Sequence, residues 1–161
     1  MKRKGKWDPD RVTDIIIIGF CVLVFIFSRF FSLEYVVGQS MEPTYHDGDM
    51  LVGMKRPEEE EISRGDVIVI DSGDGRFFIK RVVAIPGDSV QIREGILYVN
   101  DSPDRENRTM ILDAGTAEEP LVMGADEYFV MGDNRNNSED SRAFGPVRLS
   151  RIRDRVIFKI F

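Results

Sequence analysis

The sequence predicts a mainly β protein, in which one apolar N-terminal helix is followed by an antiparallel β-sheet domain. Residues 15–27 form an uninterrupted apolar run, IIIIGFCVLVFIF, without a charged side chain. Most of the remaining chain consists of short β-branched and aromatic runs separated by turn residues. It contains no long segment with a 3.6-residue hydrophobic period. Sequential short strands joined by turns favour an antiparallel sandwich or barrel.

The apolar run is long enough to cross a membrane once its flanks are included. Over residues 12–31 it has twenty residues, about 30 Å as a helix, with Asp14 and Arg29 near the two interfaces. The following segment, SRFFSLEYVV, lacks the A-x-A-like spacing of small residues that a signal-peptide cleavage site needs. We therefore expect an uncleaved anchor rather than a cleaved signal peptide or the core helix of a soluble domain.

Charge is distributed unevenly along the chain. The formal net charge is −6, but residues 1–14 carry +2 and the other 147 residues carry −8. By the positive-inside rule this predicts a cytoplasmic tail (1–11), a single transmembrane anchor (12–31) and an extracytoplasmic domain (32–161) in the cell membrane. The acidic main body argues against nucleic-acid binding. The single cysteine, Cys21, excludes an intrachain disulfide and a cysteine zinc site.

The predicted strands are short apolar runs bounded by turn residues. They cover residues 49–55, 66–71, 76–85, 90–93, 96–99, 127–133 and 155–161. Glu94-Gly95 is typical of the turn of a β-hairpin. Residues 101–125 are polar and are expected to form surface loops or a small excursion from the main sheet.

Two polar clusters are interpreted as ordinary surface structure. The four adjacent carboxylates of residues 58–61 cannot converge on one ion. Residues 134–140 alternate like calcium-loop ligands, but Glu139 stands where such a loop needs glycine. The sequence therefore predicts no metal and no cofactor.

The segment VVGQSMEPTYHDGD, residues 36–49, places a serine in a glycine-flanked turn. Gly38 lets the backbone approach a substrate closely, and Pro43 stiffens the turn after Ser40. A serine hydroxyl is a poor nucleophile unless a neighbouring base removes its proton. Without such a base, this segment is more typical of an ordinary capped turn.

Two side chains are candidates for that base. His46, the only histidine, lies in a polar turn without a Ser-His-Asp pattern. Lys80 lies inside the apolar run FFIKRVV, where alternation puts Phe78, Lys80 and Val82 on one face. If that face is buried, desolvation lowers the pKa of Lys80 and allows its neutral amine to act as a general base. The local pattern leaves open which face is buried.

A third segment, GDNRNNSEDSRAFGPV, is dense in turn-forming and hydrogen-bonding residues. Within it, Asp140 and Arg142 are spaced to form a structural ion pair. Ser138 could hydrogen-bond the Lys80 amine and orient it. These features predict a loop that supports a Ser-Lys site.

These pieces, in this order behind an anchor, resemble the type I signal peptidases, the membrane-bound serine proteases that remove signal peptides. The matching segments are GQSMEPT, RGDVIV, KRVVAIPGD and GDNRNNSEDSRAFGPV. The resemblance implies that Ser40 is the nucleophile, that Lys80 is the general base and that Ser138 orients Lys80. It also implies that Asp140 and Arg142 form a stabilising ion pair, and that Met41 lies beside the pocket for the residue preceding the cut.

One position departs from some members, which carry a serine where this chain has Gly38. Their hydroxyl helps to stabilise the oxyanion. The oxyanion hole here would rely on the Ser40 backbone N–H plus another backbone or water donor. The glycine, the single anchor and the short chain resemble the compact members from Gram-positive-type bacteria.

The resemblance implies a membrane-bound endopeptidase in contact with lipid that cleaves exported preproteins after small residues at the first and third positions before the cut. Three alternatives compete with this interpretation. One is a processing peptidase with a narrow substrate. Another is a self-cleaving repressor, but such a repressor would carry a DNA-binding domain in place of the anchor. The third is a catalytically silent β module that binds exported proteins, against which Ser40, Lys80 and Ser138 are all present.

Overall fold

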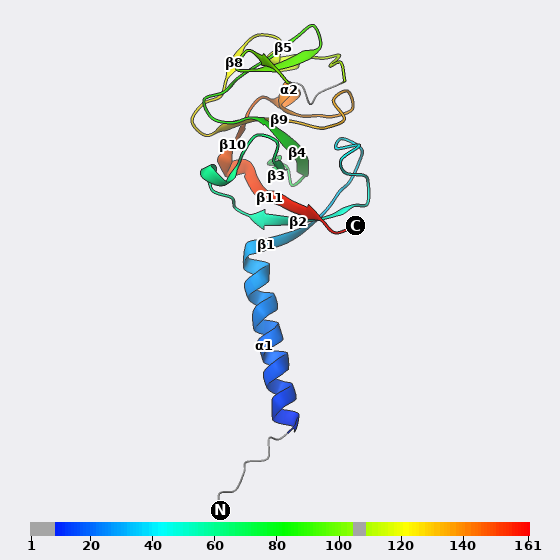
Figure 1. Cartoon of the computed structure of the whole chain (residues 1–161), viewed down its shortest axis with the longest axis vertical. Coiled ribbons are helices and arrows are strands. Elements are labelled where there is room, and N and C mark those ends of the chain that lie inside the picture. Colours follow the sequence, from blue (N-terminus) through cyan, green and yellow to red (C-terminus); the bar gives the residue numbers. More distant parts are fainter. Residues whose placement is uncertain (1–8, 105–108) are drawn as a thin grey trace, which may run out of the picture. The chain divides into compact units, whose positions relative to one another are not determined.

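The computed structural model describes residues 9–104 and 109–161, and it divides into two units (Figure 1). The first ends at Phe31 and the second, the β unit, covers Ser32–Phe161. Most of the predicted cytoplasmic tail, including its basic cluster, lies outside the described residues.

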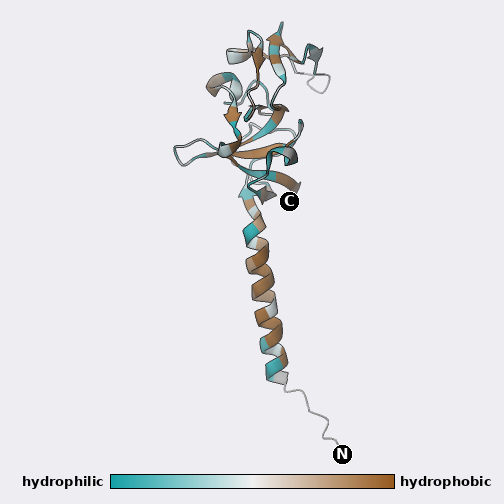
Figure 2. Ribbon diagram, turned by 90° about the vertical axis from the view of Figure 1, so that its left-hand side faces the viewer, coloured by the Kyte–Doolittle hydropathy of each residue, from teal (hydrophilic) through white to brown (hydrophobic). Residues whose placement is uncertain are grey.

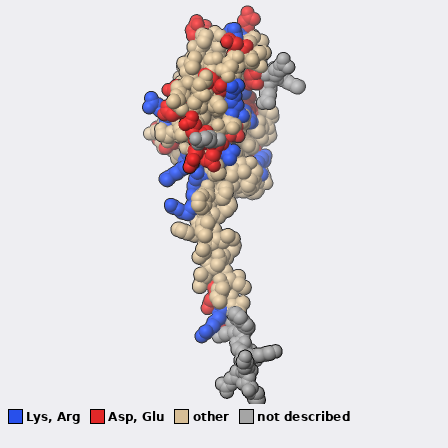
Figure 3. All heavy atoms as spheres, turned by 60° about the vertical axis from the view of Figure 1, so that its left-hand side comes forward, with Lys and Arg blue, Asp and Glu red and all other residues tan. Residues whose placement is uncertain are grey.

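The first unit is one helix, α1 (Pro9–Phe30), which is long and apolar enough to cross a membrane. Figure 2 shows its apolar middle, and Figure 3 shows few charged side chains between its ends. The helix differs from the predicted span 12–31 at both ends. It begins at Pro9, a residue suited to a first helical turn, and it stops before Phe31, which already opens a strand.

The β unit contains two antiparallel sheets, which confirms the predicted fold class. The larger sheet has the order β1 (Phe31–Tyr35), β2 (Met50–Lys55), β11 (Ile152–Lys159), β3 (Val67–Asp71), β4 (Phe77–Ala84), β9 (Glu127–Met131) and β10 (Val147–Arg148). The smaller sheet has the order β7 (Ser102–Pro103), β6 (Ile96–Val99), β5 (Ser89–Arg93) and β8 (Leu121–Val122). It lies at the end of the unit opposite β1 and β2 (Figure 1).

Strands corresponding to all seven predicted runs are present. In the β5–β6 hairpin, Glu94 and Gly95 both have positive φ, as its two-residue turn requires. Sequence patterns missed the short strands β1, β7, β8 and β10. Three of these have only two residues, and β1 continues the apolar run of the anchor without a break. The polar segment 101–125 is an excursion that supplies β7 and β8 to the smaller sheet.

Short helices fill several connections. They are α2 (Ser141–Phe144) and the 3₁₀ turns η1 (Glu59–Glu61), η2 (Gly115–Ala117) and η3 (Leu149–Arg151). Glu58 and Glu61 form a reciprocal capping box around η1. These carboxylates therefore have a local structural role, consistent with the interpretation of residues 58–61 as a surface loop.

Strand β9 separates two hydrophobic cores. Tyr128 and Val130 face one cluster, with residues of β3 and β4, while Phe129 and Met131 face the other, with residues of β5 and β6. All four side chains are fully buried. Because successive residues of a strand point to opposite faces, β9 and the adjoining β4 are covered on both sides.

The register of β4 determines the environment of two adjacent cations. Lys80 pairs with Ile68 of β3 and therefore shares the face that Ile68 and Val82 contribute to the β3–β4 core. Arg81 points to the opposite face, where it pairs with Met131 of β9. The open question of which face buries Lys80 is thus answered by strand pairing.

Candidate active site

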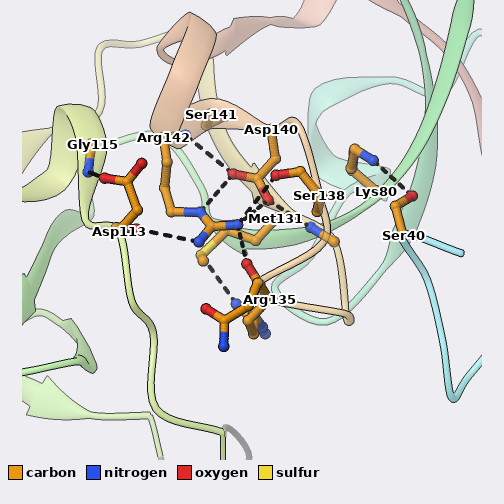
Figure 4. A network of polar contacts seen from close by, with 12 residues as sticks. Ser40, Lys80, Asp113, Gly115, Met131, Arg135, Ser138, Asp140, Ser141 and Arg142 are labelled. Atoms are coloured by element: carbon orange, nitrogen blue, oxygen red, sulfur yellow. Dashed lines mark hydrogen bonds and ion pairs between the residues drawn. The ribbon is translucent and has the colours of Figure 1, made fainter.

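Ser40 and Lys80 meet beside β4, an interior strand of the larger sheet (Figure 4). The Lys80 Nζ donates a hydrogen bond of 2.9 Å to the Ser40 Oγ. Ser40 lies in the loop between β1 and β2, and Lys80 lies on β4, so the two meet only through the fold. Lys80 is 3% exposed.

The surroundings of Lys80 favour its neutral form. Burial lowers the pKa of the amine below its ordinary value, and the positive charge of Arg142 acts in the same direction. The carboxylates of Asp140 and Glu139 oppose this effect. In the described part of the chain neither carboxylate, nor any other, comes within 4 Å of the amine to form an ion pair. The Phe78 ring lies 5.6 Å from it.

The loop that carries Ser40 is held by the segment after β9. The Asn134 backbone N–H donates to the Ser40 carbonyl at 3.0 Å, and its side-chain amide donates to the Gln39 carbonyl at 3.2 Å. Gly132 packs so closely that an added Cβ would collide with the Ser40 carbonyl and the Ser138 hydroxyl. Sequence reasoning singled out this segment but not the positioning roles of Gly132 and Asn134.

A second anchor for the same loop is an ion pair on the other face of β4. The Arg81 Nε and Nη2 donate to the two oxygens of Asp133 at 2.7 and 2.5 Å, and the Thr44 hydroxyl donates to Asp133 at 2.6 Å. Burial alone would raise the pKa of Asp133, but the bonds from Arg81 and Thr44 outweigh it and hold the pKa below its ordinary value. Sequence analysis missed this pair, although Arg81 adjoins Lys80 in a matching segment.

The predicted ion pair between Asp140 and Arg142 is present and buried. The Arg142 Nε and Nη2 each approach an Asp140 oxygen at 2.8 Å. Asp140 also caps α2 and accepts a bond from the Gly132 N–H at 3.1 Å. Arg142 donates to the Arg135 carbonyl at 2.5 Å. This network fixes the loop that faces Lys80.

The expected hydrogen bond between Ser138 and Lys80 is not formed. Figure 4 shows the Lys80 amine directed to Ser40, and the buried Ser138 hydroxyl has no hydrogen-bond partner among residues 9–104 and 109–161. The side chain is therefore near the site, against Gly132, while its orienting role stays a prediction.

The remaining predicted residues lie near Ser40 in the sequence. Gly38 has a φ of +90°, and its N–H donates to Asp47 at 2.7 Å, so this N–H is already engaged. Met41 is buried behind Ser40. His46 is exposed, and its backbone N–H bonds Asp49. The Ser40 hydroxyl bonds Lys80 instead.

A cavity of about 270 Å³ opens beside the Ser-Lys pair. Residues 34–37 form one wall and residues 77–80 of β4 the other, with Met41 and Val69 between them. A larger cavity, about 820 Å³, lies on the Arg81 face and contains neither Ser40 nor Lys80. We assign the active site to the smaller, more apolar cavity because it holds the reactive pair.

The described residues contain no group of three or more His, Cys, Asp or Glu side chains that could hold a metal ion. The chemistry available at the site is that of a serine hydroxyl beside a desolvated amine. Such a pair can perform nucleophilic acyl transfer.

Comparisons with known proteins identify the family of this chain. The family model described as "Signal peptidase, peptidase S26" matches residues 10–161. Signal peptidase I U of Bacillus subtilis is 35% identical, and the match covers 88% of this chain and 81% of that protein. Signal peptidase IB of Staphylococcus aureus is 30% identical, and the match covers 87% of this chain and 83% of that protein. A probable signal peptidase I of Synechocystis is 37% identical over 83% and 74%.

A solved structure gives the same result. The crystal structure of a signal peptidase I from Enterococcus faecalis superimposes with a TM-score of 0.51 and 29% identity, covering 60% of this chain and 97% of that chain. The β architecture, the sequence relatives and the family match over nearly the whole chain thus agree. The chain belongs to the signal peptidase family, peptidase S26, and is a type I signal peptidase, an enzyme that cleaves signal peptides from preproteins.

Proposed function

We propose that this signal peptidase works through Ser40 as nucleophile and Lys80 as general base. The observation that carries the proposal is the 2.9 Å bond between the buried Lys80 amine and the Ser40 hydroxyl. A lysine without an ion-pair partner among the described residues, in surroundings that lower its pKa, is suited to accept the Ser40 proton.

The reaction would proceed in two acyl transfers. Neutral Lys80 takes the proton as the Ser40 Oγ attacks the carbonyl carbon at the cut. The resulting ammonium protonates the leaving amine nitrogen as the peptide bond breaks, which leaves the signal peptide as an ester on Ser40. A water molecule, deprotonated by Lys80, then attacks the ester and releases the signal peptide.

The oxyanion would be stabilised by the Ser40 backbone N–H and a second donor. The Gly38 N–H is engaged by Asp47, and this chain has no side-chain hydroxyl at residue 38. We therefore propose that the second donor is a water molecule or another backbone group. Asn134 supports this geometry by holding the Ser40 carbonyl from behind.

The substrate would lie in the cavity between residues 34–37 and β4. Its volume of about 270 Å³ and its apolar lining, which includes Met41 and Phe78, suit small side chains. We propose that preproteins with small residues at the first and third positions before the cut are the substrates. The remaining supporting roles, those of Ser138, Asp140 and Arg142, belong to the same proposal.

We further propose a single anchor at residues 12–31, a cytoplasmic tail at 1–11 and an extracytoplasmic catalytic domain at 32–161. The apolar helix α1 and the charge asymmetry of the sequence support this topology. Protease added outside spheroplasts should degrade the catalytic domain and spare an N-terminal tag. Protection of the catalytic domain would contradict the proposed orientation.

Lipid is the proposed second partner of the catalytic domain. β1 begins at the residue after α1, and β1, the C-terminal part of β11 and the two residues after β11 expose large apolar side chains. They are Leu33, Tyr35, Ile157, Phe158, Ile160 and Phe161. An exposed apolar surface of this kind is typical of a contact with a membrane or another protein.

The direct test is cleavage of a model preprotein by the purified full chain in detergent or vesicles. The product should begin at the residue after the signal peptide, as read by mass spectrometry. Ser40→Ala should leave the substrate intact. Failure of the wild-type chain to cleave any of several preproteins would favour the silent binding module.

A further inference from the structure

Arg153 on β11 contacts both walls of the cavity beside Ser40 and Lys80. Its guanidinium forms an ion pair with Glu34 of β1 and lies 4.0 Å from the centroid of the Phe77 ring on β4. Glu34 and Phe77 both line the cavity. Arg153 is therefore a side-chain link between β1 and β4, two strands that both line the cavity.

No backbone ladder makes this link. In the larger sheet β2, β11 and β3 lie between β1 and β4, and β1 is an edge strand that pairs only with β2. An edge strand with one neighbour is held less firmly than a central strand. Side-chain contacts at Glu34 are thus well placed to fix the position of this wall.

Arg153 is itself held in place. Its Nε donates to the buried Asp154 at 2.6 Å, and its carbonyl accepts from the Arg56 N–H at 2.8 Å. Gly53 of β2 packs closely against Asp154, because a Cβ added to this glycine would lie only 3.0 Å from the Asp154 Cβ. A guanidinium that is both fixed at its Nε and forked can hold a carboxylate and an aromatic face together, which a lysine cannot do as well.

We propose that Arg153 is a positioning residue that sets the width of the substrate cleft, through Glu34 on one wall and Phe77 on the other. This inference rests on the proposed use of the cavity as the substrate site. Arg153 touches neither Ser40 nor Lys80 in any described contact, and the Ser40 loop is held independently by Asn134.

The expected signature separates substrate binding from chemistry. Without Arg153 the β1 wall keeps its pairing with β2 but loses its link to β4, so the KM of a peptide substrate should rise about tenfold, within the range of coupling between contacting residues. The kcat should change less than about twofold, because Ser40 and Lys80 keep their own contacts. A wider cleft should also discriminate less against a leucine at the third position before the cut.

The test compares Arg153→Met, Arg153→Lys, Glu34→Gln and the double variant Arg153→Met/Glu34→Gln. The matched control is Arg151→Met, which removes another arginine near the start of β11, one that bonds the Asp71 carbonyl. We expect Arg153→Lys to recover part of the loss, the double variant to resemble Arg153→Met, and Arg151→Met to behave as wild type.

A second measurement does not depend on cleavage. The Kd of a fluorescent signal peptide is measured for Ser40→Ala protein with and without Arg153→Met, and should weaken about tenfold. A fall in melting temperature with unchanged KM and Kd would make Arg153 a structural residue only. A loss of kcat at constant KM, or additive effects of Arg153→Met and Glu34→Gln, would also overturn the proposal. If the wild type binds peptide but cleaves none, the proposed chemistry fails while the Kd still tests the cleft.

Discussion

Lys80 and Arg81 are adjacent cations on one strand, and the fold treats them in opposite ways. Lys80 points into the face shared with Ile68 and Val82, where its amine bonds a neutral hydroxyl and forms no ion pair among the described residues. Arg81 points to the other face, where Asp133 binds its guanidinium with two hydrogen bonds.

The difference shows how one strand can supply both chemistry and support. A buried amine without a counter-ion is destabilised in its charged form, so it becomes a base. A guanidinium paired with a carboxylate stays charged and holds structure in place. The pKa of Lys80 is lowered by burial, whereas Arg81 helps to lower the pKa of Asp133.

The largest effect is expected on the Lys80 face. Ser40→Ala, Lys80→Ala and the double variant should each lose at least about 10⁴-fold in kcat and be nearly equal, because a nucleophile and its base act as one unit. Cleavage of a fluorogenic signal peptide measures this. His46→Ala, an exposed side chain, is the control and should keep wild-type activity. A folded but inactive His46→Ala would assign the base to the histidine instead.

Lowering the pH should stop cleavage by protonating Lys80, without unfolding the domain. Below the folded-state pKa of Lys80 the neutral fraction, and with it the rate, should fall about tenfold per pH unit. The pKa of Lys80 in the folded state lies below its ordinary value of 10.5, so the unfolded state binds more protons between the two values. Stability from this group therefore rises with pH across that window and is constant below it.

A pH profile of the single-turnover rate, with circular dichroism at each pH, checks this prediction. The acid limb should appear while the spectrum stays native. A rate that remains flat to well below neutral pH, in protein that is still folded, would show that Lys80 is not the titrating base.

A smaller effect is expected on the Arg81 face. Asp133→Asn should weaken the bonds to Arg81 and Thr44, costing about 2 kcal/mol in the free energy of unfolding. It should lower kcat between about 10- and 100-fold, because the loop carrying Ser40 loses one anchor. Denaturant titration and kinetics on the same preparations measure both.

Asp101→Asn is the matched control for this change, since it removes an exposed ion pair with Arg93, a residue of β5 in the smaller sheet. It should alter neither stability nor rate. If Asp133→Asn loses stability but keeps full kcat, the Arg81 face supports the fold alone and the proposed division of roles is incomplete.

The smallest effect is expected for Ser138→Ala. The hydroxyl has no hydrogen-bond partner in the part of the chain that the structure describes, so its removal should leave the melting temperature unchanged or slightly higher. If it orients Lys80 when substrate is bound, kcat should still fall about fivefold, the equivalent of one hydrogen bond of about 1 kcal/mol. An unchanged kcat would remove Ser138 from the mechanism, and a large loss of stability would give it a structural role.

Local patterns determined the elements of this protein. The apolar run predicted α1, and the turn-bounded runs predicted the seven strands, including the hairpin at Glu94-Gly95. These features depend on neighbours within a few residues, which is the range over which hydrophobic period and turn chemistry act. The motifs around Ser40, Lys80 and Ser138 are also short segments of neighbouring residues, so the sequence alone indicated the family.

Long-range pairing decided the rest. Alternation along β4 placed Lys80 and Arg81 on opposite faces of the strand. Only the register of β4 with β3 and β9 decided that Lys80 faces Ser40 and that Arg81 faces Asp133. Sequence spacing could not join Arg153 to Glu34 and Phe77, because these side chains come from three strands that meet only in the folded sheet. A strand's own sequence specifies its two faces, and its partners specify what each face meets.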